Sequence, residues 1–301
     1  MRLTQLRDFI AVIQAGSLRA AARALGISQP AMTKSIRQLE EELRVQLLLR
    51  SGRGAVATRA GKAVLARACV VQAELKNIEG DLEQLRGERT GSVVIGVSPA
   101  ASILLVPGAL ARFRRHYTDA RLRLVEGVSE FLLPMVRDAT LDFAVGPKSL
   151  AKLGAAIRFK PLYTARLVIA GRRDHPLRGA KSLGELAQAS WIGFAAPGQA
   201  GLLARMFSSA GLPPPRMVVQ CESYTTALAI LASTDALGIL VPQLLAERNA
   251  HGFLQQIRIQ DPVPDMHFGM FTRTDAPLTA AAAAMAEAVT ATARGLPRTS
   301  R

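Results

Sequence analysis

Two helical segments near the N-terminus are separated by only three residues, and this spacing leaves few possible folds. The first segment carries the small residues Ala21 and Ala22 on its apolar face and ends at Gly26. The second begins at Ser28, a candidate N-cap, with Pro30 in the first turn, where a missing N–H costs nothing. Because small residues allow two helices to cross closely, the pair predicts a helix-turn-helix.

A further helix and a hairpin complete this N-terminal region. Apolar residues from Leu3 to Ile13 recur at intervals of three and four, which predicts a helix that ends at Gly16, with Ser17 capping the next helix. Residues 50–54, Arg-Ser-Gly-Arg-Gly, predict a turn with two cations, followed by a returning strand at 56–58. We expect this hairpin to be a wing that contacts the DNA backbone or minor groove.

The outward face of the second segment carries polar side chains suited to reading DNA. Glutamine pairs bidentately with adenine, and lysine or arginine pairs with guanine or phosphate in the major groove. The alternative is a three-helix bundle with an ordinary solvated face. The candidate DNA-binding residues are Ser17, Arg19, Ser28, Gln29, Pro30, Ala31, Thr33, Lys34, Arg37, Arg50 and Arg53, and Gln38 lies on the same face.

The charge distribution favours a polyanionic partner. The 301-residue chain has a formal net charge of +15. The first sixty residues hold ten Lys/Arg and four Asp/Glu, residues 61–90 hold five of each, and residues 91–301 hold 23 and 14. Positive charge per residue is therefore highest beside the helix-turn-helix, although basic surface alone also occurs in proteins that bind no nucleic acid.

Other broad features limit the class of protein. The length predicts two or three domains. The sequence contains no run of 18 apolar residues, so we expect no membrane span, and its start does not resemble a secretory signal. Cys69 and Cys221 are too far apart for a metal motif or a disulfide framework. We therefore expect a cytoplasmic protein without metal or membrane contact.

Residues 59–88 predict one long helix without proline. Its apolar residues alternate by three and four over nearly three heptads, which is the spacing of a coiled coil. An ordinary amphipathic helix packed on its own domain is the alternative. The candidate dimer residues are Ala68, Val71, Leu75, Ile78, Leu82 and Leu85.

From Gly91 onward the pattern predicts an α/β domain with two lobes. Strands at 92–97, 121–126 and 141–145 alternate with helices ending near Phe113 and Arg137, an order that gives a parallel sheet with a ligand crevice at its carboxyl edge. A second block begins near Ala165. A strand at 266–272 and an Ala-rich helix at 279–294 would return to the first lobe, with crossovers near 161–164 and 264–267.

The predicted crevice between these lobes would hold a small molecule. Ser98, Ser102 and Ser129 adjoin helix N-termini, where backbone N–H groups favour an anion, so we expect an organic acid. A packing or turn role is the alternative at each position. The four histidines show no metal spacing, and no catalytic motif is present, so we expect no enzyme activity and no cofactor. The candidate effector residues are Ser98, Pro99, Ala100, Ser102, Val128, Ser129, Gly146, Phe194, Ala195, Ser223, Tyr224 and Pro242.

Two runs, 17–22 and 27–40, carry a family resemblance. Ser-Leu-Arg-Ala-Ala-Ala and Ile-Ser-Gln-Pro-Ala-Met-Thr-Lys-Ser-Ile-Arg-Gln-Leu-Glu resemble the N-terminal signature of LysR-type transcriptional regulators, and the wing through Gly61 also fits. The usual Phe before the wing is Leu48, the usual Leu before Thr58 is Ala57, and the customary Gly is Val45.

The resemblance implies a mainly α winged helix-turn-helix over 1–58, a linker helix that pairs two chains over 59–88, and an effector domain over 91–301. That domain would be α/β, two-lobed and similar to type 2 periplasmic binding proteins, with lobe I at 91–162 and 267–301 and lobe II at 163–266. The implied partners are double-stranded promoter DNA, a homodimer or dimer of dimers, RNA polymerase and a small-molecule effector. The paired leucines before the wing and residues 221–223 resemble members that respond to aromatic sulfonates, which suggests an aromatic anion. The alternatives are a carrier protein without DNA function and an enzyme of unrecognised type.

Overall fold

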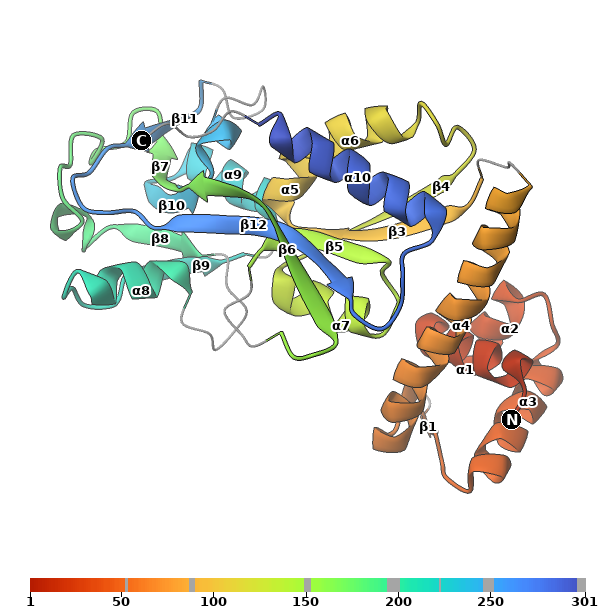
Figure 1. Cartoon of the computed structure of the whole chain (residues 1–301). Helices are drawn as coiled ribbons and strands as arrows, with labels where there is room; N and C mark the ends of the chain where they lie inside the picture. The colour runs from red at the N-terminus through yellow and green to blue at the C-terminus, as the bar shows by residue number, and fades with distance from the viewer. Residues whose placement is uncertain are drawn as a thin grey trace. The chain divides into compact units, whose positions relative to one another are not determined.

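The computed structural model describes residues 1–51, 54–86, 90–148, 153–193, 201–221, 223–245 and 252–296 (Figure 1). The chain divides into two compact units. Unit 1 comprises Met1–Glu88 with Arg137–Thr140, and unit 2 comprises Arg89–Val136 with Leu141–Arg301. Among the helices of these described residues, none is both long and apolar enough to cross a membrane.

Unit 1 begins with three short helices, α1 (Leu3–Ala15), α2 (Leu18–Ala24) and α3 (Gln29–Leu43). The predicted end of α1 at Gly16 and the predicted caps Ser17 and Ser28 are confirmed, while α2 ends at Ala24, shortly before the predicted Gly26. Gly16 ends α1 with a left-handed φ of 69°, the Ser17 hydroxyl accepts from the Ala20 N–H, and the Ser28 hydroxyl accepts from the Ala31 N–H. The α2 and α3 helices therefore form the predicted helix-turn-helix pair.

The α3 helix ends with a left-handed residue that is not glycine. Arg44 has a φ of 54°, and it directly precedes Val45, which stands where the resembled family customarily has glycine. The Arg44 N–H bonds back to the carbonyls of Glu40 and Glu41 and so closes the last turn of the helix. A non-glycine residue in this conformation costs roughly 1–2 kcal/mol.

A hairpin and a long helix complete unit 1. β1 (Leu48–Ser51) pairs antiparallel with β2 (Gly54–Ala57), and α4 runs from Arg59 to Leu85. The core of the unit is apolar, and the start of α4 joins it. The completely buried residues are Phe9, Val12, Ala21, Met32, Ile36, Leu39, Leu47 and Leu48.

Unit 2 contains two five-stranded sheets. The first has the order β4-β3-β5-β12-β6. Its strands are β3 (Ser92–Val97), β4 (Arg121–Glu126), β5 (Phe143–Pro147), β6 (Ile157–Arg166) and β12 (Asp265–Arg273). β3 is parallel to β4 and β5, which confirms the predicted parallel arrangement, while β12 is antiparallel to β5 and β6.

Helices cover both faces of this first sheet (Figure 1). α5 (Pro99–Leu104), α6 (Val106–Phe113) and α10 (Ala280–Arg294) pack into one apolar cluster with the sheet, and α7 (Ser129–Arg137) packs on the opposite face. The sequence pattern predicted a single helix through Phe113. The structure breaks it at Leu105, and Pro107, which has no N–H to donate, lies in the first turn of α6.

The second sheet has the order β11-β7-β10-β8-β9. Its strands are β7 (Val168–Arg172), β8 (Ser190–Gly193), β9 (Arg216–Gln220), β10 (Ala236–Leu240) and β11 (Leu254–Ile257). The helices α8 (Leu202–Ser209) and α9 (Tyr224–Ser233) and the 3-10 turns η1 (Gly184–Leu186) and η2 (Pro242–Leu245) accompany this sheet. The sequence pattern did not predict β11, whose four residues are too few for a clear alternation.

β6 and β12 lie at the two predicted crossovers between the sheets. They pair from Ile157 opposite Arg273 to Arg166 opposite Asp265, with a register shift at Phe268/Gly269. The Tyr163 ring of β6 stacks on the Phe268 ring of β12, with centroids 4.7 Å apart. These two strands therefore carry the chain between the lobes.

Candidate nucleic-acid interface

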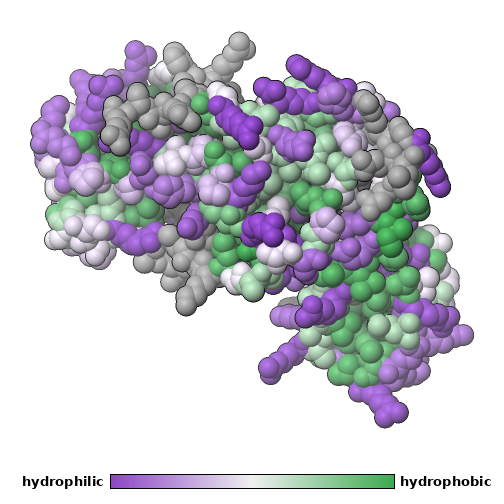
Figure 2. Space-filling model, in the orientation of Figure 1, coloured by the Kyte–Doolittle hydropathy of each residue, from purple (hydrophilic) through white to green (hydrophobic). Residues whose placement is uncertain are grey.

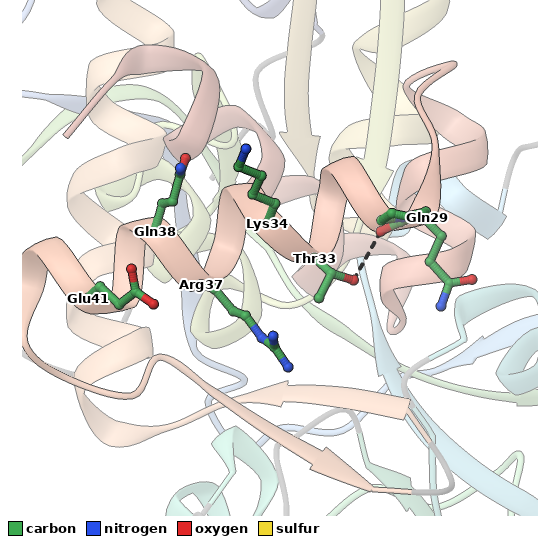
Figure 3. Close-up of a pocket in the computed structure, with 7 residues that line it drawn as sticks. Gln29, Thr33, Lys34, Arg37, Gln38 and Glu41 are labelled. Carbon is green, nitrogen blue, oxygen red and sulfur yellow. Dashed lines mark hydrogen bonds between the residues drawn. The ribbon is translucent and has the colours of Figure 1, made fainter.

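The exposed face of α3 forms an open hollow of about 620 Å³ (Figure 3). The lining includes five of the predicted DNA-binding residues, with Gln38 and Glu41 beside them. The residues that line it are Gln29, Pro30, Thr33, Lys34, Arg37, Gln38 and Glu41. With four cationic or amide side chains and one carboxylate, this face offers many hydrogen-bond donors and a net positive charge, which suits an electronegative partner.

The side chains on α3 fall on two sides of the helix. Figure 3 shows Gln29, Thr33 and Arg37, spaced by four residues, on one side and Lys34 and Gln38 on the other. The Thr33 hydroxyl donates to the Gln29 carbonyl at 3.0 Å. Positions four apart on a helix lie above one another, so Gln29, Thr33 and Arg37 form one stripe.

Hydrogen bonds on the inner side of α3 fix the orientation of this face. The Asp8 carboxylate of α1 is only 4% exposed and accepts from the Ser35 hydroxyl at 2.6 Å. The Glu40 carboxylate accepts from the N–H groups of Leu47 and Leu48 at 2.8 and 3.1 Å. Hydrogen bonds to ionised groups are stronger than neutral ones, so α3 is tied to α1 and to the wing.

Sequence reasoning missed Arg2 as a neighbour of this face. The Arg2 guanidinium donates to the Gln38 side-chain oxygen at 3.2 Å, across 36 positions of sequence. Beside it, the N-terminal ammonium pairs with Glu42. The pKa of the Glu42 carboxyl lies below its ordinary value because that ammonium, and then Gln5, donate hydrogen bonds to it. Arg2 thus lies at the edge of the hollow, bonded to the Gln38 amide, and its charge also helps to lower the pKa of the Glu42 carboxyl.

The remaining predicted DNA-binding residues lie around α3. Ser17 and Ser28 use their hydroxyl oxygens as helix caps, and Arg19 and Ala31 are exposed. Arg50 lies in β1, opposite Ala55 of β2, and Arg53 lies outside the described residues. The Ala55 N–H donates to the Gly16 carbonyl at 2.7 Å, which ties the wing to the turn between α1 and α2.

The α4 helix uses its apolar residues for two purposes. Val71, Leu75, Ile78 and Leu82 are 38–57% exposed, and Figure 2 shows apolar surface where α4 runs. Ala68 differs from the expectation, because it is 2% exposed and packs in the core of unit 1. The exposed stripe therefore begins at Val71, while the side-chain environment of Leu85 lies outside the described set.

In unit 2 the predicted effector residues of lobe I come together at the carboxyl edge of the first sheet. Ser98 and Ser129 are each 4% exposed and both lie against Gly146, where an added Cβ would be 3.2 Å from the Ser98 Cβ. Ser129 donates to the Pro147 carbonyl at 2.8 Å. Ser102 donates to the Glu126 carboxylate at 2.8 Å. A negative charge therefore already lies beside Ser102, where the sequence predicts an anionic ligand.

Only Ser98, among these three serines, retains a donor proton that no described residue accepts. Its oxygen caps α5 by accepting from the Ala101 N–H. The neighbouring Pro99 and Ala100 are buried in the first turn of α5, and Val128 is half-buried just before α7. The lobe I part of the predicted crevice therefore offers one free hydroxyl donor and an apolar helix turn.

Lobe II contributes a buried aromatic residue to the same region. Tyr224 is 7% exposed and shares an apolar cluster with Ala100 of lobe I, so the structure brings these two predicted residues together. Burial raises the pKa of the Tyr224 phenol far above its ordinary value, and that of Tyr163 likewise. Ser223 caps α9, and Pro242 begins η2, which contacts α5. Phe194 and Ala195 lie outside the described residues.

No group of three or more His, Cys, Asp or Glu residues that could hold a metal ion occurs in the part of the chain that the structure describes. Burial raises the pKa of the Cys69 thiol, which packs beside the core of unit 1.

Comparison with protein families identifies both parts of the chain. Residues 3–62 match the model of the bacterial regulatory helix-turn-helix protein, lysR family, and residues 86–294 match that of the LysR substrate binding domain. The chain belongs to the LysR family of transcriptional regulators. The chain thus carries the helix-turn-helix domain and the substrate binding domain of this family, which is one of transcriptional regulators and not of enzymes. The predicted resemblance and fold class are confirmed.

Relatives of the LysR family align with much of the chain. The regulator GbpR of Azospirillum brasilense is 28% identical over 92% of this chain and 82% of its own length. PcaQ of Agrobacterium fabrum is 28% identical over 91% and 89%. The match to TdcA of Escherichia coli, also 28% identical, covers 61% of this chain and only 59% of that relative.

Solved structures share the fold of the whole chain. A full-length OxyR variant from Pseudomonas aeruginosa superposes with a TM-score of 0.71 at 22% identity, covering 96% of this chain and 94% of OxyR. CbnR in complex with its target DNA superposes with a TM-score of 0.66 at 23% identity, covering 97% and 100%. At these identities the likeness shows the fold alone.

Proposed function

We propose that this LysR-family regulator reads promoter DNA in the major groove with the α3 face, two chains at a time. The observation that carries the proposal is the hollow whose donors Gln29, Lys34 and Arg37 project from one exposed helix. Gln29 would pair with adenine, and Lys34 and Arg37 with guanine or phosphate. Arg50 and Arg53 of the wing would contact the backbone, and Ser17, Arg19, Ser28, Pro30 and Ala31 would flank the reading face.

The experiment is equilibrium binding to duplex DNA from the chain's own upstream region. Gln29→Ala should lower the affinity for the specific duplex and leave that for a scrambled duplex unchanged, which relaxes base choice. Arg53→Ala should lower the affinity for both duplexes equally and should reduce the slope of log affinity against log salt concentration. Gln14→Ala, an exposed glutamine on α1 outside the hollow, is the matched control. Full sequence preference in Gln29→Ala would refute the role of that residue.

Two chains would pair through α4. Val71, Leu75, Ile78 and Leu82 expose large apolar side chains in a stripe, and burying them against a second copy would stabilise a dimer. Two such dimers on adjacent sites, and a contact with RNA polymerase, complete the proposal for a regulator working in the cytoplasm. We place the DNA-binding domain at 1–58, the linker helix at 59–88 and the effector domain at 91–301, with lobe I at 91–162 and 267–301 and lobe II at 163–266.

The effector would bind between the lobes, beside Ala100 and Tyr224. These residues come from different lobes and share one apolar cluster, so a ligand there could change how the lobes pack. We propose an organic acid, aromatic or otherwise, whose oxygen accepts from Ser98, within a site that includes Val128, Gly146, Phe194, Ala195, Ser223 and Pro242. A thermal-shift screen of acidic, neutral and cationic compounds tests this, and stabilisation only by non-acidic compounds would overturn the choice of class.

A further inference from the structure

We infer that Thr33 selects thymine by contact between its own methyl group and the 5-methyl group of the base. The inference rests on the proposed reading of DNA by α3 and names one base that this face would require. It starts from the hydrogen bond that the Thr33 hydroxyl makes within its own helix.

The hydroxyl of Thr33 is already engaged. Its Oγ1 donates to the Gln29 carbonyl one turn earlier, at 3.0 Å (Figure 3). A threonine in a helix has few χ1 rotamers, and this bond selects one of them. The donor proton that could have bonded to a base is thereby used by the backbone.

The methyl group of Thr33 is what remains for a partner. Figure 3 shows it on the same side of α3 as the side chains of Gln29 and Arg37, and all three residues line the hollow. Thr33 therefore presents an apolar group between an amide and a guanidinium. A hydrogen-bonding base edge would lose a partner at this point, whereas an apolar group would gain contact.

Thymine is the base that carries a methyl group in the major groove. Residues four apart on a helix are about 6 Å apart along the axis, and base pairs in DNA rise about 3.4 Å each. Gln29 and Thr33 therefore address base pairs one or two steps apart. The geometry predicts a thymine within two base pairs of the adenine that Gln29 reads.

The test removes only the methyl group of the base. The full chain first selects a duplex from a random pool, and each thymine of that duplex is then replaced singly by uracil. We expect one uracil substitution to weaken binding about fourfold, the equivalent of ~0.8 kcal/mol for one buried methyl-sized group. Binding to the thymine and uracil duplexes is then compared for two variants. Thr33→Ser keeps the hydroxyl and loses the methyl group, and Thr33→Val keeps a methyl group and loses the hydroxyl.

The variants separate the possible outcomes. Thr33→Ser should bind the thymine duplex about fourfold more weakly than the original chain and should not distinguish uracil, while Thr33→Val should still distinguish it. The inference is wrong if Thr33→Ser still binds the uracil duplex more weakly than the thymine duplex. It is also wrong if the original chain binds every uracil-substituted duplex as tightly as the thymine duplex. Neither result would contradict the proposed function. Failure of the original chain to select any duplex would instead refute the proposed function. Circular dichroism of each variant confirms that it is folded.

Discussion

Glu40 provides a sharp test of how the reading helix and the wing are held together. Its carboxylate accepts from two backbone N–H groups, those of Leu47 at 2.8 Å and Leu48 at 3.1 Å, and both leucine side chains are completely buried. Glu40→Ala leaves these N–H groups without that acceptor. A hydrogen bond to a charged group contributes about 1.5–3 kcal/mol, and Glu40 is partly exposed to water, so we expect a loss of about 2–4 kcal/mol.

Urea unfolding can resolve this loss because the single tryptophan, Trp191, lies in the core of unit 2. The Trp191 fluorescence therefore reports unit 2, whereas far-ultraviolet circular dichroism also follows the helices of unit 1. With a slope of about 1–2 kcal/mol per molar urea, the circular-dichroism transition of unit 1 should move down by roughly 2 M in Glu40→Ala. The fluorescence transition should not move.

Glu41 is the matched control. Its side chain is exposed, lines the hollow, and has no hydrogen-bond or ion-pair partner among the residues that the structure describes. Glu41→Ala should change the free energy of unfolding by less than about 0.5 kcal/mol. Because it removes a negative charge from the reading face, it should also tighten binding to any duplex. Equal stability of the Glu40 and Glu41 variants would refute the reasoning.

Three further predictions use other contacts of unit 1. Arg2→Gln should reduce the slope of log affinity for DNA against log salt by about 0.9, as measured by fluorescence anisotropy. Arg7→Gln should leave that slope unchanged, because Arg7 is paired with the neighbouring Asp8 carboxylate. Equal slopes for the two variants would contradict a DNA contact by Arg2. Leu75→Asp with Ile78→Asp should make the chain monomeric in sedimentation, and an intact dimer would argue against the α4 seam. Arg44→Gly should raise the free energy of unfolding by about 1 kcal/mol, and a decrease would show that the left-handed φ is not strained.

Local signals made the helix-turn-helix predictable from sequence. Gly16, Ser17 and Ser28 act on the backbone within three residues of themselves, so their types and positions determine the helix boundaries. The cross-links that orient α3 could not be predicted in the same way. Asp8 bonds to Ser35 across 27 positions, and no periodicity in either helix marks that pair.

For the long helix and the predicted crevice, the sequence pattern predicts the elements correctly but not all of the contacts that their side chains make. The heptad spacing includes Ala68, yet the first turns of α4 pack on their own unit, so one periodicity serves a core and then an exposed stripe. The serines at the carboxyl edge were predicted by position, but hydroxyl direction depends on distant acceptors. Ser102 donates to Glu126 at 2.8 Å, a shorter contact than the 3.1 Å to the nearby Pro99 carbonyl, and Ser129 donates to Pro147; neither Glu126 nor Pro147 is near its serine in sequence.

Deazapurines, in which carbon replaces one ring nitrogen, test most directly whether α3 lies in the major groove. In the selected duplex, 7-deazapurines remove only the major-groove N7 acceptor, and 3-deazaadenine removes only the minor-groove N3 acceptor. At the positions that α3 reads, we predict at least about fivefold weaker binding of the full chain on loss of N7 and no change on loss of N3. The reverse pattern would contradict the account.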